Sequence, residues 1–303
     1  MISDLLLRAA QNKKLESLVS GNALTRGTVR RFVAGVSLQE AIRVAQRMNS
    51  EGIDVSLDLL GESVEDLAES AAATDQYIET VQTIAERAPG ATVSVKLSQL
   101  GIGVDPQACA KNLDRLLEAS AAVGVLVEVD MEHSSVGRPT LEAFRDALPR
   151  HPQTRLAIQA AMRHTPEDLE SFTDIKPRLR LVKGAFAEPL SRALRDRKEI
   201  TAQYLFLTDW ILAHCPYPAF GTHDDVCIEN VKKAAVAAGV GKRDFEFQML
   251  YGVRRDVQRQ LVREGYRVRV YVPFGTQWYP YLMRRMAERP ANLLFFLRSV
   301  VGR

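Results

Sequence analysis

The chain has 303 residues, of which 46% are hydrophobic and 25% are charged, which is typical of a globular protein. Its net charge is only +3 and its basic residues are spread along the chain, so we expect no nucleic-acid partner. It contains no apolar run of about 18 residues and no apolar stretch typical of a secretion signal near its start, so we predict neither a transmembrane helix nor export.

The three cysteines, Cys109, Cys215 and Cys227, are far apart and form no CxxC pair. This spacing argues against a zinc site or a disulfide framework, and it fits a reducing cytoplasm. We therefore interpret all three as small packing residues and expect no bound metal. The sequence leaves the oligomeric state open.

Residues 1–50 precede the first strand-like run and are expected to form a helical segment. After them, short runs rich in β-branched residues alternate with longer segments of helical spacing, which predicts a parallel sheet. Eight such units follow one another, and eight strands close a TIM-like (βα)8 barrel. The expected strands are Ile53–Leu59, Thr92–Leu97, Val125–Asp130, Thr154–Gln159, Arg178–Lys183, Pro218–Thr222, Asp244–Met249 and Arg267–Val272.

Segments with helical spacing separate these strands, and two of them begin with a capping signal. Asp105 stands before Pro106 and Thr165 before Pro166, so each pair places a capping side chain ahead of a proline in the first turn. No linker or break in composition divides the chain, so we predict one α/β domain over residues 1–303. The expected helices include Val64–Arg87, Pro106–Val123, Pro166–Ile175, Val226–Ala238 and Arg254–Glu264.

Several of the expected strands alternate apolar and polar residues, although strands buried on both faces are usually apolar throughout. In the third strand, for example, Val127 and Val129 lie on the face opposite Glu128 and Asp130. The apolar set should pack under the outer helices, which leaves the polar set to line the lumen. Buried charges are costly unless they are compensated, so these groups must pair with one another or with a ligand.

Catalytic residues of such barrels lie at the carboxyl ends of the strands. By themselves the residues at these positions leave several functions open. Carboxylates and histidines such as Asp130, His133 and His223 could bind a divalent metal, and Lys96 or Lys183 could form a Schiff base. A barrel that binds an anion without catalysis is a third alternative. The polar residues at the strand ends are Asp58, Glu62, Lys96, Asp130, Glu132, His133, Gln159, Arg180, Lys183, Thr222, His223, Asp224, Gln248, Tyr251 and Tyr271.

Four ordered segments resemble motifs of proline dehydrogenases of the monofunctional bacterial type. Val93–Ser98, Arg180–Ala185 and Phe245–Gln248 resemble that family's strand motifs, and Tyr281–Glu288 resembles its substrate-binding helix. The resemblance implies a distorted (βα)8 barrel that binds FAD non-covalently, with substrate-binding and C-terminal helices in residues 279–303. It also implies oxidation of L-proline to Δ1-pyrroline-5-carboxylate by hydride transfer to FAD, the first step of proline catabolism, with a membrane quinone as electron acceptor.

The resemblance also implies roles for individual residues. Lys96, Arg284 and Arg285 would bind the proline carboxylate, in keeping with the match between a guanidinium fork and a carboxylate. Tyr271 and Tyr281 would flank the pyrrolidine ring. Glu62 would form a gate by pairing with Arg284 over the substrate.

Asp130 and Arg180 would be the catalytic residues, Asp130 beside substrate and flavin and Arg180 near the redox-active N5 atom of the flavin. A glycine-rich dinucleotide fingerprint is absent, which argues against a Rossmann-type FAD domain but not against a flavin bound in a barrel. The expected FAD contacts are Met131, Gln159, Arg180, Val182, Lys183, Gly184, Ala185, Thr222 and His223.

The segment Asn292–Val301 near the C-terminus is markedly apolar. We expect it to pack against the barrel, with contact to a bilayer or a partner surface as the alternative. The expected location is therefore the cytoplasm, with peripheral attachment to the inner face of the cell membrane left open.

Overall fold

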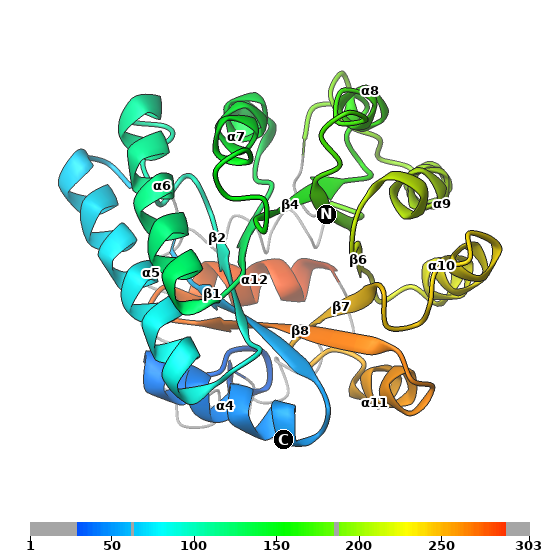
Figure 1. Ribbon diagram of the computed structural model, residues 1–303, viewed down its shortest axis with the longest axis horizontal. Coiled ribbons are helices and arrows are strands. Elements are labelled where there is room, and N and C mark those ends of the chain that lie inside the picture. The colour runs from blue at the N-terminus through cyan, green and yellow to red at the C-terminus, as the bar shows by residue number, and fades with distance from the viewer. Residues whose placement is uncertain (1–28, 62–63, 185–187, 289–303) are drawn as a thin grey trace.

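The computed structural model describes residues 29–61, 64–184 and 188–288, and these form a closed barrel of parallel strands (Figure 1). The strands follow one another in chain order, and the barrel closes where β1 pairs with β8. The predicted (βα)8 barrel is therefore confirmed. Its strands are β1 (Asp54–Leu59), β2 (Thr92–Val95), β3 (Val127–Val129), β4 (Arg155–Gln159), β5 (Arg178–Val182), β6 (Ala219–Gly221), β7 (Glu246–Leu250) and β8 (Arg267–Phe274).

Helices surround the strands in a ring, as Figure 1 shows for α4 to α11. Most of the expected helices lie within a few residues of their predicted bounds, and the Asp105 carboxylate caps its helix by accepting from the backbone N–H groups of Gln107 and Ala108. The helices are α4 (Leu38–Ser50), α5 (Leu67–Arg87), α6 (Pro106–Val123), α7 (Ser134–Ala147), α8 (Thr165–Glu170), α9 (Arg197–His214), α10 (Asp225–Ala237), α11 (Arg255–Arg263) and α12 (Trp278–Glu288).

The prediction that Thr165 caps a helix is wrong. Its hydroxyl donates to the backbone carbonyl of Gln159 at 2.7 Å, so the side chain ties α8 to the end of β4. The helix begins at Thr165 itself, after His164, and it ends at Glu170 instead of continuing to Ile175.

The alternation of polar and apolar residues has the predicted meaning. Val127 and Val129 of β3, like Phe247 of β7, belong to the apolar core between strands and helices. Glu128 and Glu246, on the opposite faces of the same strands, are fully buried in the lumen. The three cysteine side chains are free thiols and all are buried, as expected of packing residues.

Helix α12 follows β8 and, in red, crosses the middle of the view in Figure 1. Tyr279 and Leu282 belong to an apolar cluster with Phe32, and Tyr281 packs with Leu60 just after β1. The helix is thereby held near the carboxyl end of β1. None of the helices in the described ranges is long and apolar enough to cross a membrane.

Some predictions concern residues outside the described ranges. Most of the expected N-terminal helical segment, residues 1–28, falls there, as does the apolar segment Asn292–Val301. The assignment of all of residues 1–303 to one domain therefore stays a prediction.

Candidate active site

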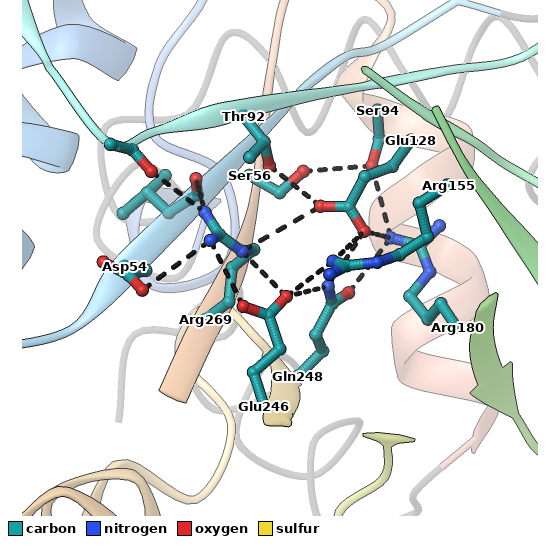
Figure 2. A network of polar contacts seen from close by, with 12 residues as sticks. Asp54, Ser56, Thr92, Ser94, Glu128, Arg155, Arg180, Glu246, Gln248 and Arg269 are labelled. Carbon is teal, nitrogen blue, oxygen red and sulfur yellow. Dashed lines mark hydrogen bonds and ion pairs between the residues drawn. The ribbon is translucent and has the colours of Figure 1, made fainter. Parts of the chain in front are cut away.

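A network of buried charges lies in the lumen between the amino ends and the middle of the strands (Figure 2). The Glu246 carboxylate accepts hydrogen bonds from Arg155 Nη1 at 2.7 Å and from Arg269 Nε at 3.0 Å. The Glu128 carboxylate accepts from Arg155 at 3.2 Å and from Arg180 at 3.3 Å. The Gln248 amide connects the two acids, because its Nε2 donates to Glu128 at 2.8 Å and to Glu246 at 2.7 Å. At this level the charged groups of the lumen pair with one another, although Arg155 Nε and Arg180 Nε are buried with no acceptor among the described residues.

The arginines keep both buried glutamates ionised. Burial alone would raise the pKa of each carboxyl group. Around Glu246 the charges of Arg269 and Arg155 outweigh burial and hold the pKa of that carboxyl far below its usual range. Arg155 and Arg180 likewise lower the pKa of Glu128. The charges of the two glutamates are therefore compensated by arginines of the same network.

Arg180 connects this network to a second cluster at the carboxyl ends of the strands. Its Nη1 donates to Ser94 Oγ at 3.3 Å and to Gln248 Oε1 at 3.1 Å, and its Nη2 donates to Asp130. The other Asp130 oxygen accepts from the Tyr271 hydroxyl at 2.6 Å. Three strands thus place Asp130, Arg180 and Tyr271 in direct contact, which is possible only because all three side chains point into the lumen.

Lys96 completes this cluster from the end of β2. Its Nζ lies 2.5 Å from Asp58 Oδ1 and 3.6 Å from Asp130 Oδ2. Burial works to lower the pKa of Lys96, but the carboxylates of Asp58 and Asp130 outweigh it and raise the pKa to about 12. Burial, with Asp130 and Asp58 nearby, also raises the pKa of Tyr271 well above its ordinary value. The lysine is therefore a fixed cation and the tyrosine a neutral hydroxyl.

A third group of polar residues lies at the ends of β4, β5 and β6. Gln159 pairs in register with Val182, and its amide donates to the backbone carbonyls of Met131 and Glu132 at 3.2 and 3.0 Å. Lys183 Nζ donates to Thr201 at 2.7 Å and to Asp224 at 2.6 Å.

Gly184 follows directly on β5 with a φ of 103°, a conformation that favours glycine. The next strand end, after β6, carries Thr222 and His223. His223 Nε2 accepts from the backbone N–H of Leu250 at 2.8 Å, which attaches this end to β7. The structure thus brings the described residues of the expected FAD site to the adjacent strands β3, β4, β5 and β6, and their roles stay predictions.

The donor set at these strand ends is compatible with a flavin. Arg180 Nε is buried, and no residue that the structure describes accepts a hydrogen bond from it. A ring nitrogen of an isoalloxazine is an acceptor of the required kind, and the Lys183 ammonium suits the negative charge of a diphosphate.

The predicted substrate helix is only partly described. The Arg285 guanidinium lies 5.3 Å from the centre of the Tyr281 ring, one helical turn away on α12, and Tyr281 is buried. Glu62, Ala185 and the side chain of Arg284 lie outside what the structure describes. The predicted gate between Glu62 and Arg284 therefore stays a prediction.

The structure also reveals residues of the site that had no role in the sequence-based predictions. Asp58 stood among the strand-end residues, and its pairing with Lys96 could not be read from the sequence because the two strands are joined only by folding. Arg155 was missed altogether. A usable signal was its position in β4, where it shares the lumen-facing register with Gln159 four residues later.

The metal and Schiff-base alternatives lack support in the described residues. No group of three or more potential metal ligands gathers in that part of the chain. Glu132 accepts from the backbone N–H and the hydroxyl of Ser98, at 3.0 and 2.5 Å, and His133 caps α7, so the two side chains serve different partners. Lys96 and Lys183 are both paired with carboxylates, whereas a Schiff-base lysine needs a neutral amine.

Comparison with known proteins identifies the family. The sequence model described as "Proline dehydrogenase" matches residues 41–298 of the chain. The chain belongs to the proline dehydrogenase family. It is 35% identical to "Proline dehydrogenase 1" of Bacillus subtilis (strain 168) over 301 residues, which cover 99% of each protein. It is 37% identical to "Proline dehydrogenase" of Deinococcus radiodurans over 276 residues, 89% of each protein.

A solved structure shares the fold of this proline dehydrogenase family member. Proline utilization A (PutA) from Bdellovibrio bacteriovorus, described as inactivated by N-propargylglycine, matches with a TM-score of 0.82 and 26% identity. The match covers 87% of this chain but 33% of that one, so the chain spans about a third of the larger protein. The family and the barrel together support an oxidoreductase that acts on proline and carries out the first step of proline catabolism.

Proposed function

We propose that this enzyme oxidises L-proline to Δ1-pyrroline-5-carboxylate with bound FAD and delivers the electrons to a membrane quinone. The observation that carries the proposal is the contact of Lys96, Asp130, Arg180 and Tyr271 at the carboxyl ends of the strands, in a member of this family. FAD, when bound, would supply the hydride acceptor that no side chain can provide.

The residues proposed to hold FAD come from neighbouring strand ends. Gln159, Lys183, Gly184 and Thr222 supply an amide, an ammonium group, a permissive backbone and a hydroxyl. The buried Arg180 Nε, with no acceptor in the described residues, would donate to the ring system. Met131, Val182, Ala185 and His223 complete the proposed set.

The proline carboxylate would be bound by Lys96 together with Arg284 and Arg285. Tyr271 and Tyr281 would flank the ring, and Glu62 would close over it by pairing with Arg284. Holding a substrate in a reactive orientation contributes up to about 7–11 kcal/mol in well-oriented systems. Because each Asp130 oxygen already accepts from Arg180 or Tyr271, we assign Asp130 the role of orienting these two groups beside the reacting atoms.

A membrane quinone as acceptor would bring the enzyme to the cytoplasmic face of the cell membrane. Quinone-containing vesicles test this part of the proposal. Reduction of the quinone by proline should require the enzyme, and its rate should rise with the amount of vesicle surface.

The cofactor and the substrate are tested together. Protein purified with FAD should show flavin absorbance bands, and proline added without oxygen should bleach them. Arg285→Met should lower kcat/KM for proline at least about tenfold, since a charge-assisted hydrogen bond contributes about 1.5–3 kcal/mol.

Pyrrolidine, which lacks the carboxylate, should be a poor substrate of the wild type and should lose little more in this variant. Arg150→Met is a matched control, because Arg150 pairs with Asp114 on the surface. A colourless protein that cannot be reconstituted with FAD would refute the flavin. An unchanged KM of Arg285→Met with FAD retained would favour a barrel that binds anions without oxidising proline.

A further inference from the structure

Asp58 is a buried carboxylate at the mouth of the barrel. It lies in β1 beside Ser94 of β2, and only 1% of its surface is exposed. Lys96 follows Ser94 by two residues and faces the same side of the barrel, so its side chain reaches Asp58 Oδ1 at 2.5 Å. Asp58 therefore contacts the ammonium group of Lys96, which binds the substrate carboxylate in the proposed function.

Lys96 needs such a partner to remain a cation. Its side chain is 17% exposed, and burial of this degree favours the neutral amine. Asp130 is less suited to the task, because it lies 3.6 Å away and already accepts from Arg180 and Tyr271. Asp58 is closer, and it raises the pKa of Lys96 more than Asp130 or Glu132 does. The Lys96 ammonium group also donates to the Tyr271 hydroxyl at 3.4 Å. Burial raises the pKa of Asp58, and the charge of Lys96 opposes that shift.

We propose that Asp58 is the positioning residue of the carboxylate site: it fixes the Lys96 ammonium group at the lumen wall and keeps it charged, so that a nearly buried lysine binds the substrate's carboxylate. This role rests on the proposed function. Asp58 does not touch the substrate and acts through Lys96. If the ion pair had a purely structural role and only joined β1 to β2, its loss would lower stability. It would not change how the charge of Lys96 affects anion binding.

The pH dependence of anion binding separates the two roles. The probe is cyclopentanecarboxylate, a proline analogue without the amine, titrated into the FAD-bound enzyme and followed by the change in flavin absorbance. In the wild type the Kd should stay constant between pH 7 and 10 to within about twofold, because the pKa of Lys96 is raised to about 12. In Asp58→Asn the Kd should rise at least about fivefold over this range, since a nearly buried lysine without its closest carboxylate loses part of its charge as the pH rises.

Asp58→Glu restores the charge and should restore the constant Kd. Asp54→Asn is the matched control, because Asp54 lies at the start of the same strand, where it pairs with Arg267 at 2.9 Å and with Arg269 at 3.6 Å but not with Lys96. Its Kd should follow the wild-type profile. A second measurement needs neither flavin nor activity: acetic anhydride should acetylate Lys96 several-fold faster in Asp58→Asn, because neutral amines react.

Three outcomes decide the matter. Parallel Kd profiles for wild type and Asp58→Asn, or equal acetylation of Lys96, would overturn the role of Asp58 while leaving the proposed function standing. A wild-type enzyme that binds no cyclopentanecarboxylate and bleaches with no proline would overturn the carboxylate site itself, and the role of Asp58 with it. A pH-dependent Kd in Asp58→Asn alone, with faster acetylation, supports the proposal.

Discussion

Glu246→Gln tests whether the lumen network stabilises the fold through charge. The substitution keeps the size of the side chain but removes the negative charge that Arg155 and Arg269 share at 2.7 and 3.0 Å. All three side chains are almost completely buried, so water cannot replace the lost carboxylate. Removal of one partner from a buried ion pair costs about 3–5 kcal/mol, because the other charge is left uncompensated.

That free energy corresponds to a measurable change in melting temperature. With about 2.1 cal/mol/K of unfolding entropy per residue over 303 residues, the Tm should fall by roughly 5–8 °C. Scanning calorimetry of the two proteins measures this difference directly.

Asp75→Asn provides the control. It breaks the 2.8 Å pair with Arg115 on the surface, where both side chains are about half exposed or more. Such pairs contribute about 0–1 kcal/mol, so the Tm should change by less than about 2 °C. If Glu246→Gln lowered the Tm no more than Asp75→Asn does, the network would not be the stabilising element inferred from its geometry.

Two further predictions concern acid and the flavin site. The arginines lower the pKa of Glu128 and Glu246 in the folded protein, so their stabilisation is present above the ordinary glutamate pKa of about 4.3 and is lost as the pH falls below it. The Tm of the wild type should therefore fall steeply below about pH 4.3, and less steeply in Glu246→Gln; parallel curves would contradict this. Gly184→Ala should cost about 1–3 kcal/mol and weaken FAD retention, because φ is 103° and the new Cβ would lie 2.8 Å from Gln159 Oε1. Gly103→Ala, with nothing within 4 Å of its Cβ, should match the wild type in Tm and in bound FAD.

The barrel could be predicted from the sequence because its signals are local. The period-two pattern around Glu128 is visible within one strand, and it fixes which face of β3 is buried in the lumen. The ends of the strands were predicted less accurately than their faces. β8 extends to Phe274 because Leu59 of β1 pairs with it, and such pairing depends on a strand more than 200 residues away.

The site could be predicted only in part, for the same physical reason. The period-two pattern places Lys96 and Asp130 at the carboxyl ends of their strands. Their proximity therefore follows from the barrel alone. Which carboxylate binds which cation depends on side-chain reach and on the stagger of the strands. The partners of Asp58 and Arg155 could therefore be identified only in the structure. Thr165 shows the same limit, since a capping signal in the sequence was overridden by a carbonyl group from β4.

The ion network occupies the lumen at the amino-terminal side of the barrel, which leaves the carboxyl end as the expected entrance. Glu128, Glu246 and Arg155 are buried in the lumen on the amino-terminal side of Asp130, so protein side chains occupy that part of the lumen among the described residues. We therefore expect a molecule that reaches the cluster of Lys96, Asp130 and Tyr271 to enter and leave at the carboxyl end. A reductant and an oxidant that use the same entrance must bind one after the other. The first product then has to leave before the next reactant can bind.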